Sequence, residues 1–149
     1  RYPRGRGINP DWIQPYQKIE IGKAKELQKG SKVAVLSTGF IGNSVTSALA
    51  KIKNTDQFAH FDFAFVKPLD EKLLHGIFNA FQHIITIEDG TVSGGFGSAI
   101  LEFSATHNYT SSIKTLGIPD EFIEHATIEE LQRYCKIDIK SLENLFSNY

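Results

Sequence analysis

Two arginines at the start of the chain have the side chains best suited to binding an anionic ligand. Arg1 and Arg4 flank Pro3 in the run RYPRG. Each guanidinium offers a planar fork of N–H donors that matches phosphate oxygens, and proline stiffens the backbone between them. The run is therefore either a phosphate-binding arm or a solvated terminal arm, and the residues alone favour the second interpretation.

A glycine-rich turn at residues 93–98 (SGGFGS) follows a predicted strand and opens a predicted helix. Helix N-termini in this position bind phosphate in many nucleotide-binding proteins. The turn does not match GxGxxG, because Ile100 stands where the third glycine of the motif would be. No GK[ST] follows, as a P-loop would require. We favour the interpretation that the glycines let the helix backbone approach the sheet closely.

Glu88 and Asp89 stand at the carboxyl end of the same predicted strand. Ligands of open α/β sheets usually bind at this edge. A general acid or base there needs a partner that shifts its pKa, and the sequence shows none. A polar strand end or a subunit contact is at least as good an interpretation, so no catalytic residue is predicted.

The remaining reactive side chains form no recognisable site. The histidines show no HxH or HExxH spacing, and Cys135 has no CxxC partner, so no metal site is predicted. No GxSxG nucleophile motif occurs. We expect Cys135 to be a small buried hydrophobe, His60 a partly buried imidazole with hydrogen-bond partners, and Thr127 with Glu130 a helix capping box. The five histidines are His60, His75, His83, His107 and His125.

The composition is that of one ordinary globular domain, with 149 residues, 41% hydrophobic, 22% charged and a net charge of −1. This charge argues against binding to nucleic acid or to a membrane surface. Apolar runs are too short for a membrane span, and cytoplasm is the expected location. The chain opens on Arg1 without methionine, which suggests a piece of a longer polypeptide.

Strand and helix patterns alternate along the chain, which predicts βαβ units and a mostly parallel sheet. Residues 1–17, rich in Gly, Pro and Arg, are expected to be an extended segment leading in from a preceding domain, and residues 18–149 to be the domain. We expect strands at 19–26, 33–37, 58–66, 83–89 and 111–118, the first of them an antiparallel edge strand. Helices are expected to begin near 43 and to cover 71–81, 98–106, 128–134 and 139–147, with Asp70 as the N-cap of the helix at 71–81.

Six motifs in this order resemble the C-terminal domain of the 1-deoxy-D-xylulose-5-phosphate synthase family. They are RYPRG at 1–5, IGKAKEL at 21–27, VAVLSTGF at 33–40, FVKPLDEKLL at 65–74, TIEDGTVSGGFGSAILEF at 86–103 and LGIPDEFIEHAT at 116–127. The resemblance covers nearly the whole chain. The GGFGS turn is shared more widely, with transketolases and with 2-oxoacid dehydrogenase E1 β subunits.

The resemblance implies a three-layer α/β sandwich with a five-stranded sheet, four strands parallel and one antiparallel. It also implies an enzyme that joins pyruvate to glyceraldehyde 3-phosphate with loss of carbon dioxide. Thiamine diphosphate and Mg²⁺ would be bound by pyrimidine-binding and diphosphate-binding domains outside these residues, in a homodimer. Arg4 would help to hold the acceptor phosphate, with Arg1 as its neighbour, and the domain alone would be inactive. The alternative is a C-terminal domain of a transketolase or an E1 β subunit that docks a partner protein.

Overall fold

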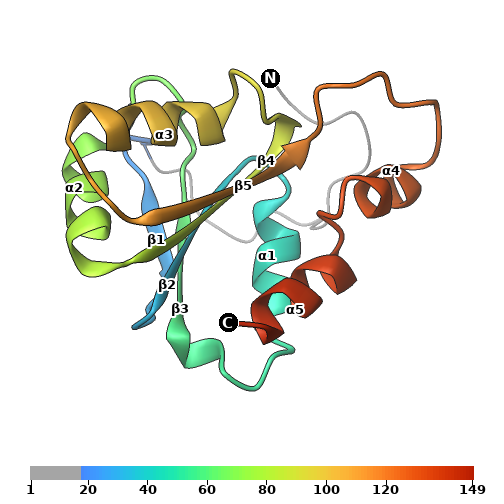
Figure 1. Cartoon of the computed structure of the whole chain (residues 1–149), viewed down its shortest axis with the longest axis horizontal. Helices are drawn as coiled ribbons and strands as arrows, with labels where there is room; N and C mark the ends of the chain where they lie inside the picture. The colour runs from blue at the N-terminus through green and yellow to red at the C-terminus, as the bar shows by residue number, and fades with distance from the viewer. Residues whose placement is uncertain (1–17) are drawn as a thin grey trace.

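The computed structural model describes residues 18–149, which form one sheet covered by helices on both faces (Figure 1). The strands are β1 (Lys25–Gln28), β2 (Val33–Thr38), β3 (Phe58–Asp62), β4 (His83–Thr91) and β5 (Ser112–Ile118). The α-helices are α1 (Gly42–Leu49), α2 (Glu71–Ala80), α3 (Phe96–Thr106), α4 (Ile128–Tyr134) and α5 (Ile139–Ser147), and a short 3₁₀ helix covers Thr55–Gln57. None of the helices in this part of the chain is both long and apolar enough to cross a bilayer.

The sheet has the strand order β1-β3-β2-β4-β5. Four strands run parallel, and β1 pairs antiparallel with β3 at the edge. Val35, in the centre of β2, pairs with His60 on one side and with Ile85 on the other. The predicted fold class, a mostly parallel five-stranded sheet with one antiparallel edge strand, is confirmed.

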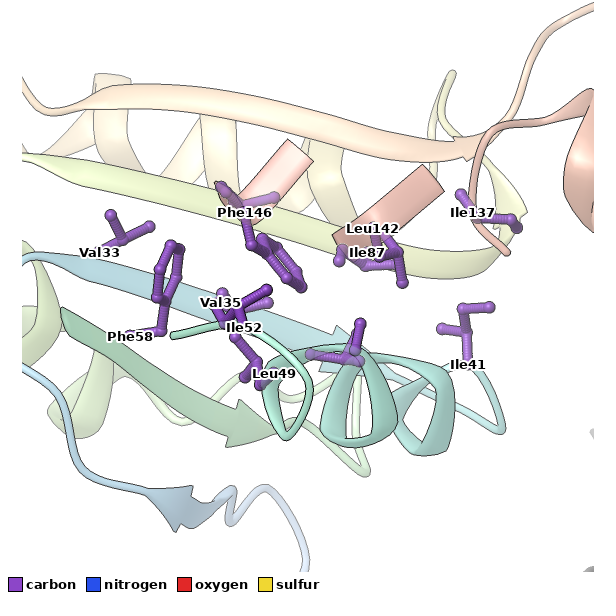
Figure 2. Close-up of a cluster of buried hydrophobic side chains, with 13 residues drawn as sticks. Val33, Val35, Ile41, Leu49, Ile52, Phe58, Ile87, Ile137, Leu142 and Phe146 are labelled. Atoms are coloured by element: carbon purple, nitrogen blue, oxygen red, sulfur yellow. The ribbon is translucent and has the colours of Figure 1, made fainter. Parts of the chain in front are cut away.

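One face of the sheet is covered by α1 and α5 (Figure 1). Every second residue of β2 points to this face, as the alternation of a strand requires. Figure 2 shows Val33 and Val35 of β2 beside Leu49 of α1 and Leu142 and Phe146 of α5. All five side chains are completely buried.

The other face of the sheet is covered by α2 and α3. Ala34 and Leu36 of β2 point to this side and pack with Leu74 of α2 and Ile100 of α3. The uninterrupted apolar run of β2 is thus buried on both faces, as expected of a central parallel strand. The result is a three-layer α/β sandwich.

The first strand begins later than predicted. The alternation of Ile19 and Ile21 suggested a strand at 19–26, but both side chains are largely exposed and β1 starts at Lys25. Gly22 lies in a turn with a φ of +73°, in the left-handed region that favours glycine. The chain therefore turns just before the strand, which the alternation does not reveal.

Four other boundaries differ by two residues or more, and the rest agree within one residue. Strands β1 and β4 each end two residues later than predicted. The strand predicted at 58–66 ends at Asp62, and α3 begins at Phe96, two residues before the predicted start. As predicted, Asp70 caps α2 by accepting the Leu73 N–H at 3.2 Å. Residues 1–17 lie outside the described part of the chain, so the proposed division at residue 17 stays a prediction.

Candidate functional site

The carboxyl edge of the parallel strands is where a ligand site is expected in a sheet of this kind. In open α/β sheets, ligands bind where the strand order reverses. Here this point lies between β2 and β4, since the chain proceeds from β2 to β3 on one side and to β4 on the other. Glu88 and Asp89 stand near the end of β4, beside the loop that follows β2.

Glu88 binds the N-terminus of α3. Its two carboxylate oxygens accept the N–H groups of Phe96 and Gly97, each at 2.9 Å. The side chain is 4% exposed, so this carboxylate occupies the position in which a phosphate would meet the helix. The sequence located Glu88 at a strand end, but its role as an internal anion for α3 was missed.

The glycines of the turn allow this arrangement. A Cβ atom on Gly95 would lie 2.3 Å from Glu88 Oε2, and one on Gly97 would lie 2.8 Å from the Thr86 and Thr115 side chains. Only glycine fits at such distances. The interpretation of close backbone approach is confirmed, and the phosphate interpretation is not supported, because the donors are already bound.

Asp89 performs a similar task on the other helical layer. Its Oδ2 accepts the Ile41 N–H at 3.1 Å, at the N-terminal end of α1. Between β2 and β4, where ligands of such sheets usually bind, the N-terminal end of α1 is therefore bound by the Asp89 side chain. Within residues 18–149, the hydrogen bonds described for Glu88 and Asp89 are with N–H groups at the starts of two helices.

The pair His60 and Ser37 resembles a nucleophile and its base but is sealed in the core. Ser37 Oγ lies 2.8 Å from His60 Nε2, and Thr46 Oγ1 lies 3.4 Å from Nδ1. Ser37 and His60 are at most 1% exposed. Burial lowers the pKa of His60 to about 4, so the imidazole is neutral at physiological pH. The predicted hydrogen-bond partners are confirmed, and the burial is deeper than expected.

Cys135 is half-buried against the core layer of α1 and α5. Burial, and then the negative charge of Glu121, raise the pKa of its thiol. A raised pKa leaves less of the nucleophilic thiolate at neutral pH. This agrees with the predicted role of a small hydrophobe. Among residues 18–149, no group of three or more His, Cys, Asp or Glu side chains is arranged to hold a metal ion.

An open groove of about 610 Å³ lies between the segment after β5 and helix α4. Its walls are mainly apolar, with carboxylates and a histidine at the rim. The lining residues are Asp89, Ile118, Glu121, Phe122, Ile123, Glu124, His125, Ile128, Leu131, Gln132, Cys135 and Ile137. Sequence reasoning missed this groove, although the cluster of apolar and acidic residues in GIPDEFIEHATI was its visible signal.

The predicted substrate-binding residues, Arg4 and Arg1, lie outside the described residues. Their role in binding phosphate therefore stays a prediction. Of the residues between 18 and 149 that line the groove, Glu121 and Glu124 are acidic and none is Lys or Arg, so this part of the groove does not favour an anionic substrate.

Comparison with models of known protein families identifies the family of this chain. The model of the family described as "Transketolase, C-terminal domain" matches residues 22–142. The chain belongs to this family. As a transketolase C-terminal domain, it has the mixed sheet and the two helical layers described above.

Curated relatives of this transketolase C-terminal domain are named 1-deoxy-D-xylulose-5-phosphate synthase. The one from Bacteroides thetaiotaomicron is 50% identical over 144 residues, covering 95% of this chain and 22% of that protein. The one from Cytophaga hutchinsonii is 47% identical over 149 residues, covering 99% of this chain and 23% of that protein. The chain thus spans less than a quarter of the length of these relatives.

Two solved structures show the same fold. A split-gene transketolase, described as an inactive β4 tetramer, superimposes with a TM-score of 0.80 at 23% identity, covering 93% of this chain and 46% of that one. The transketolase of Campylobacter jejuni gives a TM-score of 0.58 at 13% identity, covering 86% and 19%. At these identities the likeness concerns the architecture alone.

Proposed function

We propose that this chain is the C-terminal domain of a thiamine-diphosphate-dependent 1-deoxy-D-xylulose-5-phosphate synthase. The observation that carries the proposal is the identity of 50% over 95% of the chain to a protein with that name. The whole enzyme would convert pyruvate and glyceraldehyde 3-phosphate into 1-deoxy-D-xylulose 5-phosphate and carbon dioxide, in the cytoplasm. This product is a precursor of isoprenoids and of thiamine.

The residues described here do not fit the cofactor. Binding a diphosphate with Mg²⁺ requires carboxylate ligands around the metal and free N–H donors for the phosphates. At the end of β4, Glu88 and Asp89 are instead engaged with the N–H groups of α3 and α1. We therefore assign thiamine diphosphate and Mg²⁺ to the pyrimidine-binding and diphosphate-binding domains of the longer chain, and no step of the reaction to residues 18–149.

The contribution of this domain to the active site would come from its N-terminal arm. Arg4 would hold the phosphate of glyceraldehyde 3-phosphate, and Arg1 would stand beside it. The acidic rim of the groove leaves the arm as the better candidate for an anionic ligand. The rest of the domain would pack against its neighbours within the same chain and support a homodimer.

A transketolase or an E1 β subunit is the alternative parent protein. The relatives named synthase share 37% to 50% identity with the chain, whereas the two transketolase structures share 23% and 13%. This difference favours the synthase.

The test is Arg4→Ala in the full-length enzyme. Loss of a charged hydrogen bond to phosphate costs about 1.5–3 kcal/mol, which is a rise of roughly 10- to 150-fold in the KM for glyceraldehyde 3-phosphate. The KM for pyruvate should stay unchanged, and Arg6→Ala, which changes a neighbouring arginine, serves as the control. An acceptor KM that does not move in Arg4→Ala would rule out this role.

A further inference from the structure

The groove beside α4 has walls that expose large apolar side chains at one place. Phe122 and Ile128, which line the groove, are 108% and 58% exposed, and Tyr134, at the end of α4 but not among the lining residues, is 60% exposed. Helix α4 has no buried residue at all. Scattered apolar side chains are normal on a protein surface, but a cluster of them around a groove marks a surface that another element covers.

The walls of the groove are held in place by interactions of their own. A complete capping box formed by Thr127 and Glu130 fixes the start of α4. Tyr134, at the end of α4, donates a hydrogen bond of 2.8 Å to Glu121 on the opposite wall. The groove is therefore preformed, which lowers the entropy that a partner must offset on binding.

The charge of the rim indicates the kind of partner. Glu121 and Glu124 line the groove together with His125, and none of its lining residues between 18 and 149 is Lys or Arg. Arg133 of α4 lines a separate polar hollow with Asp138 and Lys140. A ligand with a carboxylate or phosphate would be repelled, and a second copy of the same surface would place like charges opposite one another.

We infer that this groove docks a segment with an apolar centre and Lys or Arg at its flanks, supplied by the part of the synthase chain outside these 149 residues. The inference rests on the proposed function. The chain covers 22% of the length of the Bacteroides thetaiotaomicron relative, so most of such a protein is left to supply the segment. Its apolar centre would cover Phe122 and Ile128, and its basic flanks would face Glu121 and Glu124.

Photocrosslinking in the full-length protein tests the inference. Phe122 is replaced by p-benzoylphenylalanine, and unlabelled subunits are mixed with ¹⁵N-labelled ones to separate crosslinks within a chain from those between chains. We expect a crosslink within one chain to an apolar segment that is flanked by Lys or Arg and lies outside these 149 residues. The same substitution at Leu101 of α3, which is 44% exposed, is the control and should not give that product. A crosslink to residues 1–17 would overturn the inference.

A crosslink between two copies of Phe122 or α4 would identify a second copy as the occupant and overturn the inference. The absence of any protein crosslink at Phe122 would show an uncovered surface and overturn it as well. A crosslink to a segment without basic flanks would contradict its charge argument.

A charge reversal provides a second measurement. Glu124→Lys should lower the crosslink yield roughly threefold, since one exposed ion pair is worth about 0.5–1 kcal/mol. Glu129→Lys, on α4 but not among the lining residues, should leave the yield unchanged. Equal yields for the two variants would contradict the charge argument. Synthase activity of the same preparation is measured separately. An active enzyme that gives no crosslink would refute the inference but would leave the proposed function standing.

Discussion

Two adjacent carboxylates near the end of β4 serve two different helices. Successive side chains of a strand point to opposite faces of the sheet. Glu88 accordingly reaches α3 in one helical layer, and Asp89 reaches the start of α1 in the other. Their position at the strand end was visible in the sequence. Their partners were not, because the N–H groups that they bind are brought to them only by the packing of helices on the sheet.

The role of Glu88 can be tested by Glu88→Ala. The substitution leaves two buried N–H groups of α3 without an acceptor, at about 1–3 kcal/mol each, so the free energy of unfolding should fall by about 2–6 kcal/mol. Urea denaturation measures this change. Glu102→Ala, at an exposed position of the same helix, is the matched control and should change stability by less than about 0.5 kcal/mol. Equal effects of the two substitutions would refute the capping role.

His60 makes stability depend on pH in a defined window. Its pKa is about 4 in the folded chain against an ordinary value of 6.5, so the unfolded chain binds the extra proton between these values. Its contribution is complete above pH 6.5 and is lost as the pH falls toward 4, by about 3 kcal/mol in total. His60→Gln, which cannot titrate, should flatten the curve of unfolding free energy in this window. An unchanged slope would show that other groups cause it.

Helices α2 and α4 have well-formed N-terminal caps but different surroundings. Asp70 of α2 is 8% exposed and also accepts the Ala24 N–H at 3.2 Å, which ties the start of β1 to the helix. Thr127 caps α4, a helix without buried residues. The sequence predicted both caps equally well, because a cap is a local pattern. It could not rank their importance, which depends on what each helix packs against.

A pair of cap substitutions separates the two cases. Asp70→Ala should reduce the global free energy of unfolding by about 1–2 kcal/mol, because α2 belongs to the core layer. Thr127→Ala should change the global value by less than about 0.5 kcal/mol, while amide exchange in α4 becomes faster. Denaturation and hydrogen exchange on the two variants measure these effects. A global loss in Thr127→Ala similar to that in Asp70→Ala would show that α4 is part of the cooperative core.

The 149-residue chain as a whole should fold but have no synthase activity. It possesses two complete core layers, and among residues 18–149 no group of three or more His, Cys, Asp or Glu side chains is arranged to hold a metal ion. The measurement is product formation from pyruvate and glyceraldehyde 3-phosphate with thiamine diphosphate and Mg²⁺, and circular dichroism confirms folding. The full-length enzyme is the positive control. Turnover by the short chain would contradict the assignment of the cofactor to other domains.

At the level of the whole molecule, periodic patterns predicted most of the fold. The buried run of β2 and the apolar stripes of the helices depend on local periodicity, and they appear where expected. The start of β1 was wrong, because exposed Ile19 and Ile21 alternate without contributing to a sheet. The groove could not be foreseen, since it exists only where the segment after β5 meets α4.

The position of α5 has a consequence for synthesis of the protein. Leu142 and Phe146 complete a core layer whose other members, such as Val33 and Val45, precede them by about a hundred residues. During translation, β2 and α1 are made early, and the part of the cover that α5 supplies is made about a hundred residues later. Until α5 has left the ribosome, the nascent chain therefore exposes part of an apolar sheet face. Chaperones recognise such a surface and proteases attack it. Ribosome stalling late in this domain should thus be far more damaging than its small missing length suggests.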